Sequence, residues 1–256
     1  MRYLILSDLH SNLEALDAVL AATKGAFEQV VCCGDLVGYG PDPDPVVEWA
    51  RENVAEVVRG NHDKACSGVM DTEDFSEPAR LAADWTREHL TPENAQYLRN
   101  LPQGPRDVAG EFTVLHGSPR DEDEYVPTPW DARELFELLR HRISFFGHTH
   151  LQGGFISTGK GFVNQIVEAS LRGAFEEVSH RESRRILEIH PDETYFLNPG
   201  SVGQPRDRDN RAAFAIFDTE GFVEYGRVSY DVETTMSKIL QAGLPEFLAY
   251  RLILGR

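Results

Sequence analysis

The chain has 256 residues, of which 41% are hydrophobic and 26% are charged, so it is long enough to bury a sizeable core in a globular fold. Its formal net charge of −17 opposes binding to a polyanion such as DNA, and no lysine- and arginine-rich block with interleaved aromatic residues offsets that charge. The opening apolar run stops at Asp8, which is too short for a signal peptide, and no later stretch is long enough to cross a bilayer.

The cysteine content points to a reducing compartment. The three cysteines, Cys32, Cys33 and Cys66, are an odd number and form no C-x-x-C pair, which favours a cytoplasmic location. Internal repeats, low-complexity segments and linkers are absent from the sequence. We therefore expect a single domain over residues 1–256.

The first 150 residues alternate between strand-like and helix-like segments. Short apolar runs predict strands at residues 2–8, 29–35, 55–63, 112–118 and 143–150. Apolar residues at helical spacing predict helices at residues 11–22, 46–54, 75–90, 91–101 and 129–142. Ser11 and Glu14 read as a capping box for the first helix, and Pro129 suits the first turn of the last. This alternation is typical of a layered α/β fold.

The remainder of the chain reads as β-rich. We expect a hairpin at residues 153–164 that turns at residues 158–161, a strand at residues 194–201, and a second hairpin at residues 211–231 that turns at residues 219–221. A late helix is predicted at residues 233–243. The segment 165–193 carries no readable pattern.

Each of the five strands expected in the first 150 residues ends in a polar cluster. These clusters contain Asp8 and His10; Asp35; Asn61, His62 and Asp63; His116; and His148 and His150. In open α/β sheets, ligands bind beyond the carboxyl ends of the strands. Side chains two residues apart on an extended segment point the same way, so Asp8 and His10 could share one target, as could His148 and His150.

The clusters hold enough donors for two metal ions that share a ligand. The candidate donors are Asp8, His10, Asp35, Asn61, His116, His148 and His150. Because four of them are imidazoles, manganese, iron, nickel or zinc fits better than calcium or magnesium. Two such ions would also supply the positive charge that a phosphate needs inside an acidic protein.

Five short motifs carry a family resemblance. SDLH, GDLVGYG, GNHD, HGS and GHTH occur in the order typical of the calcineurin-like metallophosphoesterase superfamily, and the chain is most similar to its small bacterial and archaeal phosphodiesterases. NPGSVGQPR, at residues 198–206, resembles a later block of those members. The resemblance implies an α/β fold, a four-layer αββα sandwich of two mixed sheets flanked by helices, with the β-rich second half forming the other sheet.

The resemblance also implies a role for each residue. Asp8, His10 and His150 would hold the first metal, Asp35 would bridge, Asn61, His116 and His148 would complete the second, His62 would donate a proton, and Asp63 would orient the His62 ring. The implied activity is a dinuclear phosphoesterase, most simply a phosphodiesterase that hydrolyses a small ester through a metal-bridging hydroxide. Manganese is the favoured ion, and neither a membrane nor a nucleic acid polymer is an expected partner.

Two other functions remain open on the same fold. One is a phosphomonoesterase or a Ser/Thr-type protein phosphatase, although the Asp-Arg pair that protein phosphatases carry soon after the bridging aspartate is missing after Asp35. The other is a non-catalytic scaffold, which the complete donor set disfavours.

Individual residues also have plainer interpretations. A lone His116 would be a core histidine, Asp35 a turn residue, and His62 a ring that binds substrate without donating a proton. The acidic run at residues 121–124 is a solvated loop or the border of the site. The roles of Tyr39, Arg120 and Arg206, as phosphate-binding, stacking or surface residues, stay open, and His89, His141, His180 and His190 read as surface residues.

Overall fold

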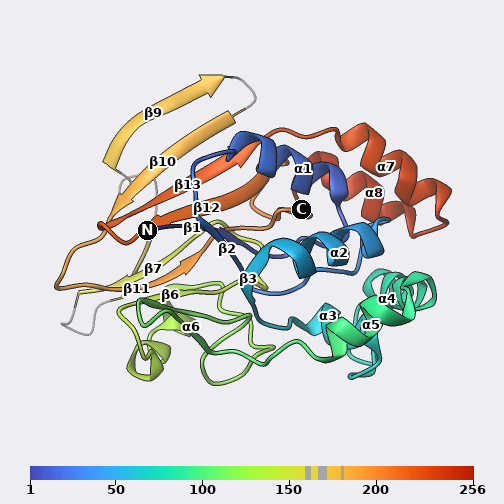
Figure 1. Cartoon of the computed structure of the whole chain (residues 1–256), viewed down its shortest axis with the longest axis horizontal. Helices are drawn as coiled ribbons and strands as arrows, with labels where there is room; N and C mark the ends of the chain where they lie inside the picture. The colour runs from blue at the N-terminus through green and yellow to red at the C-terminus, as the bar shows by residue number, and fades with distance from the viewer. Residues whose placement is uncertain (159–162, 167–171, 180–181) are drawn as a thin grey trace.

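Two β-sheets pack face to face in the computed structural model, which describes residues 1–158, 163–166, 172–179 and 182–256 (Figure 1). The first sheet has seven strands, in the order β3 (Val54–Val57), β2 (Gln29–Cys32), β1 (Arg2–Leu6), β12 (Ala212–Asp218), β13 (Phe222–Val228), β10 (Glu182–Glu188) and β9 (Arg172–Ser179). The second has six, in the order β4 (Arg106–Val108), β5 (Phe112–Val114), β6 (Ile143–Phe145), β11 (Thr194–Asn198), β7 (Gly153–Ser157) and β8 (Val163–Gln165).

The core between the sheets follows from the alternation of side chains along each strand. In β1, Tyr3 and Ile5 face the second sheet, whereas Leu4 and Leu6 face the helices on the outer side. The Tyr3 ring meets Phe112 of β5 with the ring centroids 5.0 Å apart. Apolar residues on both faces of β1 therefore place this strand in the middle of the layers.

Helices cover both outer faces, so the expected four-layer αββα sandwich is confirmed. The helical elements are α1 (Leu13–Ala22), α2 (Pro43–Asn53), α3 (Asn61–Ser67), α4 (Glu77–His89), α5 (Pro92–Arg99), α6 (Pro129–Ala132), the 3₁₀ helix η1 (Leu135–Leu138), α7 (Val232–Gln241) and α8 (Glu246–Leu254). Buried residues of α1, α2 and α5 pack on the seven-stranded sheet, and those of α6 and η1 pack on the six-stranded sheet. Helices α4, α7 and α8 share a smaller apolar cluster.

The two halves of the chain do not divide into the two sheets, which corrects one expectation. Strand β12 pairs antiparallel with β1, with Leu4 opposite Ile216, and β11 pairs parallel with β6, with Phe196 opposite Ser144. All seven residues of β12 are buried, and a strand that is apolar on both faces is stable only in the interior of a sheet. Each sheet is therefore built from both halves.

Several local predictions also differ from the structure. The helix expected at residues 129–142 breaks into α6 and η1, where only Ala132 and Leu135 are buried, so packing adds little to a helix that is costly to nucleate. Asn12, rather than Ser11, caps α1 by accepting a hydrogen bond from the Ala15 nitrogen at 3.2 Å. Strands β4, β9 and β10 and helices α3 and α8 were not predicted. Residues 61–63, expected at the end of a strand, instead begin helix α3.

The other predicted strands and helices are confirmed, with shifted ends. Strands β7 and β8 form the expected first hairpin, whose turn lies largely outside the described residues. Strands β12 and β13 form the second hairpin, and Figure 1 shows α7 and α8 side by side next to α1. Within the described residues, no helix has both the length and the apolar character that a membrane span requires.

Candidate metal centre

All seven predicted donors converge beyond the carboxyl ends of five strands. Those strands are β1, β2 and β3 of the first sheet and β5 and β6 of the second, so the site lies across the ends of both sheets. Two buried groups have ligand atoms that all lie within 4.8 Å of one another: Asp8 with His10 and His150, and Asp35 with His116 and His148. The structure thus brings together residues that are up to 142 positions apart.

The local reason for this convergence differs from the one predicted. Strand β1 ends at Leu6, and Asp8 and His10 lie in the following loop with φ angles of 52° and 46°. Strand β6 ends at Phe145, and His148 and His150 have φ angles of 65° and 60°. These left-handed conformations are costly for residues other than glycine, and such conformations concentrate at functional sites. Left-handed turns, rather than an extended backbone, therefore direct the side chains of Asp8 and His10, and those of His148 and His150, toward the site.

Backbone hydrogen bonds between the loops hold these turns in place. The Asp8 nitrogen donates to the Gly34 carbonyl at 3.0 Å, and the His10 nitrogen donates to the Asp35 carbonyl at 3.1 Å. The Gly147 nitrogen donates to the His116 carbonyl at 2.8 Å. The position of each ligand is thereby set by a neighbouring ligand loop.

Each of the four imidazoles uses one ring nitrogen to bond a backbone carbonyl. The pairs are His10 Nδ1 with Val37 O at 2.9 Å, His116 Nδ1 with Cys33 O at 2.8 Å, His148 Nε2 with Asp123 O at 3.0 Å, and His150 Nδ1 with Gln204 O at 2.6 Å. Because a carbonyl only accepts, each of these nitrogens carries a proton, and the other nitrogen of a neutral ring has a free lone pair. All four rings are thus oriented as metal ligands.

The free nitrogens face one another across distances that suit a shared cation. His10 Nε2 and His150 Nε2 are 3.2 Å apart, and His116 Nε2 and His148 Nδ1 are 3.0 Å apart. Two neutral imidazoles cannot hydrogen-bond each other through two lone pairs, so either a proton or a metal ion must lie between them. The donor chemistry therefore fits metal ions at both groups.

Asp35 lies between the two groups. Its Oδ2 atom is 3.7 Å from His10 Nε2 of the first group and 3.4 Å from His116 Nε2 of the second. Within the described part of the chain, Asp35 Oδ2 and Asp8 Oδ2 are buried and have no hydrogen-bond partner. A buried carboxylate oxygen without a partner is unstable unless a cation neutralises it, so both oxygens fit metal ligation.

In the metal-free protein, bound protons neutralise part of the negative charge that metal ions would otherwise neutralise. Burial raises the pKa of the Asp8 carboxyl to about 7. Burial lowers the pKa of His116, but the adjacent Asp35 carboxylate outweighs it and raises the pKa to about 10. Burial lowers the pKa of His148 to about 3. Metal binding at neutral pH must therefore displace the proton on His116.

Asn61 and His62 begin helix α3 at the edge of these groups. The Asn61 Oδ1 atom lies 3.3 Å from His116 Nε2, which places the amide with the second group. The His62 ring packs between Tyr39 and Phe75, with centroid distances of 4.3 Å and 4.9 Å, and burial lowers its pKa to about 4. His62 is thus positioned by packing and is neutral at pH 7.

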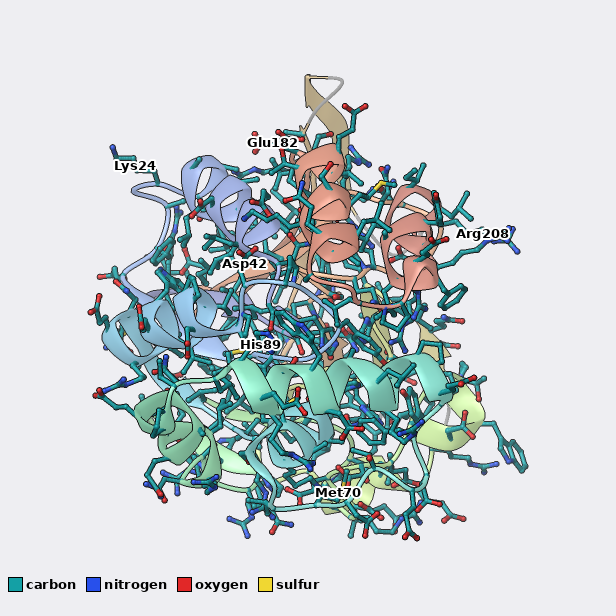
Figure 2. All side chains as sticks on the ribbon, turned by 90° about the vertical axis from the view of Figure 1, so that its right-hand side faces the viewer. Lys24, Asp42, Met70, His89, Glu182 and Arg208 are labelled. Atoms are coloured by element: carbon teal, nitrogen blue, oxygen red, sulfur yellow. The ribbon has the colours of Figure 1, made fainter. Side chains whose placement is uncertain are left out.

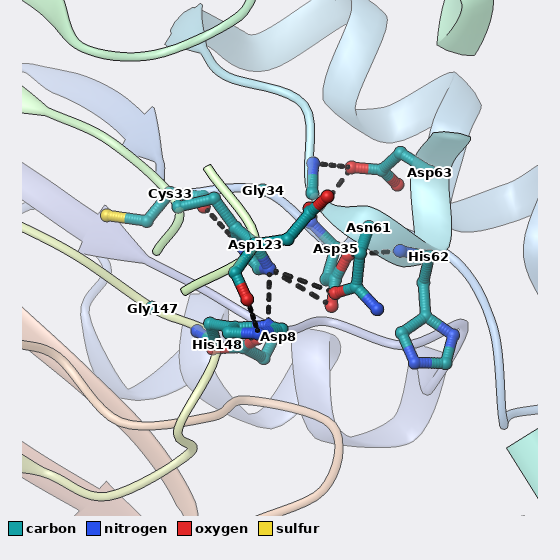
Figure 3. Close-up of polar contacts among 12 residues, drawn as sticks. Asp8, Cys33, Gly34, Asp35, Asn61, His62, Asp63, Asp123, Gly147 and His148 are labelled. Atoms are coloured by element: carbon teal, nitrogen blue, oxygen red, sulfur yellow. Dashed lines mark hydrogen bonds and ion pairs between the residues drawn. The ribbon is translucent and has the colours of Figure 1, made fainter. Parts of the chain in front are cut away.

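Asp63 does not orient the His62 ring, contrary to expectation. Its carboxylate accepts hydrogen bonds from the backbone nitrogens of Asp35, Leu36 and Gly60 at 2.8–2.9 Å, and His62 Nδ1 has no hydrogen-bond partner among the described residues. Figure 3 shows the Asp63 carboxylate turned toward this backbone and away from the His62 ring. Asp63 instead fixes the loop that carries Asp35.

A cavity of about 490 Å³ opens beside the second group. Asn61, His62 and His148 line it on the metal side, and it also includes Arg206 and Tyr39. Arg206 and Tyr39 are thereby assigned to the cavity wall.

The acidic run at residues 121–124 borders the same cavity. Asp123 lines the wall and forms an ion pair with Lys64, with Nζ and Oδ2 2.6 Å apart. Arg120 does not line the cavity: it is exposed and forms an ion pair with Glu124.

The predictions missed residues that hold the ligand loops from behind. Asn198 Nδ2 donates to the Gly147 carbonyl at 2.9 Å, and Ser201 Oγ donates to the Asp8 carbonyl at 2.8 Å. Both belong to the NPGSVGQPR segment, which drew notice only through its resemblance to a known block. Arg251 and Tyr125, which also line the cavity, carried no readable signal.

Comparison with known proteins agrees with this geometry. Residues 1–221 match the calcineurin-like phosphoesterase superfamily domain. The chain is 34% identical to the uncharacterized protein MJ0912 of Methanocaldococcus jannaschii, over 98% of this chain and 97% of that protein. It is 37% identical to a metallophosphoesterase of known structure from Sphaerobacter thermophilus, which covers 100% of this chain and 99% of that one with a TM-score of 0.83.

A third protein shares the fold. The hypothetical protein PH1004 of Pyrococcus horikoshii is 20% identical, covering 100% of this chain and 98% of that one with a TM-score of 0.76. The chain therefore belongs to the calcineurin-like phosphoesterase superfamily and is a metal-dependent phosphoester hydrolase.

Proposed function

We propose that this protein is a phosphodiesterase that hydrolyses a small phosphate ester with two divalent ions. The observation that carries the proposal concerns four imidazoles on the two sides of Asp35. Each ring is fixed by a hydrogen bond to a backbone carbonyl, so that its other nitrogen points toward the remaining ligand atoms of its own group. An imidazole-rich donor set favours manganese, iron, nickel or zinc, and manganese is our choice.

The seven donors divide between two ions in this proposal. Asp8, His10 and His150 would hold the first ion, Asn61, His116 and His148 would hold the second, and Asp35 would be shared between them. The chemistry that two such ions would supply when bound is activation of a water molecule and neutralisation of charge on the phosphoryl oxygens.

His62 acts on the leaving group in our proposal. The neutral ring carries one N–H group, and its location on the cavity wall beside Asn61 allows this group to hydrogen-bond a leaving oxygen. As that oxygen gains negative charge, the charge favours protonation of the ring and offsets the effect of burial on its pKa. His62 would then take up a proton from solvent, pass it to the leaving oxygen and return to its neutral form.

The cavity supports a small substrate rather than a protein substrate. A volume of about 490 Å³ is in the range of small-molecule sites. The aromatic rings of Tyr39, Phe75 and Tyr125 form part of its wall. We also propose a cytoplasmic location, because Cys32, Cys33 and Cys66 are buried free thiols.

The test compares two chromogenic esters after the protein is stripped with EDTA and reloaded with manganese. We expect turnover of bis-p-nitrophenyl phosphate to exceed that of p-nitrophenyl phosphate. A strong preference for the monoester would support the phosphomonoesterase alternative instead. If the protein binds no metal and turns over neither ester after loading, it is a scaffold.

A further inference from the structure

Two arginines that have no aspartate or glutamate partner among the described residues line the cavity beside the metal centre. Arg206 follows the loop that bonds His150, and Arg251 lies on helix α8. Among the described residues, no aspartate or glutamate oxygen lies within 4.0 Å of either guanidinium. These are the only arginine or lysine side chains among the described residues of the cavity wall.

Arg206 is held in place by neutral groups. Its Nη2 atom donates to Gln204 Oε1 at 3.0 Å and to the Tyr39 hydroxyl at 3.3 Å. Its Nε atom is buried and has no acceptor in the described part of the chain. A buried donor without an acceptor costs free energy, and a charged donor costs more, so an anion in the cavity would satisfy it.

Arg251 reaches the same region from the C-terminal helix. Its Nε donates to a main-chain oxygen of Arg256, the last residue of the sequence, and its guanidinium carbon lies 5.2 Å from the Phe247 ring centroid. Burial, together with the nearby charge of Arg206, lowers the Arg251 pKa to about 10. The two guanidiniums therefore repel each other while both remain charged at pH 7.

The two arginines differ in their distance from the metal centre. The Arg206 backbone nitrogen donates to the His150 carbonyl at 3.3 Å, which places Arg206 beside the first group, whereas Arg251 is carried by helix α8, which supplies none of the metal donors. Arg251 thus lies further along the cavity. One phosphate held by the ions would leave the Arg251 end of the cavity without an anion.

We propose that Arg206 and Arg251 form a subsite for a second phosphate, carried by the ester that this site hydrolyses. The inference rests on the proposed phosphodiesterase function and narrows its substrate to esters with two phosphate groups. In a protein of net charge −17, two guanidiniums that have no aspartate or glutamate partner among the described residues supply a local positive charge that a singly charged ester does not need. The exposed residues Asp71 and Asp74 line the same cavity and would disfavour an anion elsewhere in it than at the two arginines.

Arg251 of helix α8 belongs to the proposed subsite but is not one of the metal donors. The family match ends at residue 221, so Arg251 lies outside the matched region, whereas every metal donor lies inside it. A substitution at Arg251 can therefore change which ester is bound without altering a metal ligand.

The test uses two esters that differ only in the second phosphate. These are the p-nitrophenyl ester of thymidine 5′-phosphate and the same ester carrying a 3′-phosphate. With the manganese-loaded protein, we expect kcat/KM to be at least about tenfold higher for the second ester, mainly through KM, as one charge-assisted interaction predicts. Arg251→Gln should abolish this preference, and Arg251→Lys should retain part of it.

Arg208→Gln is the matched control. It removes the same charge from an exposed residue, and Figure 2 shows Arg208 extending away from the molecule. This variant should keep the preference of the wild type. If the wild type does not discriminate between the esters, or if Arg251→Gln weakens both equally, the proposal is overturned, the second result indicating that Arg251 binds the scissile phosphate.

A binding measurement separates this proposal from the phosphodiesterase function. Isothermal titration of the manganese-loaded protein with thymidine 5′-phosphate and thymidine 3′,5′-bisphosphate should show tighter binding of the bisphosphate by at least about tenfold. Loss of this difference in Arg251→Gln supports the subsite even if neither ester is hydrolysed. Hydrolysis of both esters with equal binding of the two ligands refutes the subsite alone. If Arg251→Gln does not fold, Arg206→Gln is measured in its place.

Discussion

The carboxylate of Asp63 is bonded directly to the backbone of Asp35, with Oδ2 accepting a hydrogen bond from the Asp35 nitrogen at 2.9 Å. The same carboxylate also binds the Leu36 and Gly60 nitrogens. We therefore expect Asp63→Asn, which replaces one acceptor oxygen by a donor, to lower the free energy of unfolding by about 1–3 kcal/mol.

Urea unfolding of the metal-free protein measures this loss. Asp71→Asn, at an exposed position, is the control and should leave stability unchanged within about 0.5 kcal/mol. An Asp63→Asn protein as stable as the control would show that the carboxylate does not support the Asp35 loop.

Asp35 is expected to serve both ions. Because its Oδ2 lies near His10 and near His116, Asp35→Asn should weaken both metal sites together, by at least about tenfold each. Metal content after dialysis against dilute manganese gives the readout. His150→Asn is the matched variant, since it belongs to the first group alone and should lower the content by about one ion per chain. Loss of a single ion from Asp35→Asn would contradict the bridging role.

His62 is expected to matter most for esters with poor leaving groups. His62→Asn should retain both ions and lose roughly a hundred- to ten-thousandfold in kcat for an alkyl leaving group, because an alkoxide needs a proton. For p-nitrophenolate, which leaves without protonation, the loss should be much smaller. The measurement is kcat against leaving-group pKa for the variant and the wild type. If log kcat depended on leaving-group pKa with the same slope in both proteins, proton donation by His62 would be excluded.

Gly38 provides an independent perturbation of the same ring. An added Cβ would lie 2.5 Å from His62 Nδ1, so Gly38→Ala must displace the imidazole. Gly25→Ala is the control, because Gly25 has a similar φ of +76°, against +88°, but open space around it. Both variants should lose about 1–2 kcal/mol of stability from the left-handed backbone, whereas only Gly38→Ala should lose activity. Equal activity in the two would show that the ring position is unimportant.

The metal-free protein should become less stable as the pH rises from about 7 to about 9. The pKa of His116 is raised to about 10 in the folded state, so its stabilising contribution is complete below its unfolded value near 6.5 and is lost toward pH 10. Asp8, with its pKa raised from 3.8 to about 7, adds a loss that falls mainly below this window, between about pH 4 and 7. Thermal unfolding in EDTA measures the trend, and bound manganese should remove it. A constant melting temperature in EDTA would refute the proton-holding role of His116.

The sequence was sufficient to predict which polar residues lie together but not how the sheets are arranged. The polar residues after apolar runs, such as Asp8 after β1 and His116 after β5, follow a local rule and could be predicted. The partners of a strand are set by long-range packing, so the pairing of β12 with β1 had no local signal. For the same reason, the hydrogen bonds of Asp63 to a loop far away in the sequence could not be predicted from its position next to His62.

Two further differences have physical causes. Left-handed backbone is uncommon for any residue other than glycine, even for Asp and His, which adopt it more often than most, so the sequence favoured an extended backbone at Asp8 and His148. Arg251 lies 45 positions beyond Arg206 in a helix without any motif, so only the fold brings it to the cavity. Functional residues that belong to short motifs can thus be predicted from the sequence, whereas those brought to the site only by tertiary packing cannot.

The donation of metal ligands by loops from both sheets has a consequence for assembly of the protein. Neither sheet alone contains a complete group, since Asp8 depends on His150 and Asp35 depends on His116. A nascent or partly folded chain would therefore bind neither ion tightly and would be catalytically silent. Metal uptake by this protein would therefore indicate that folding is complete. Until then, the chain would not hydrolyse cellular phosphoesters.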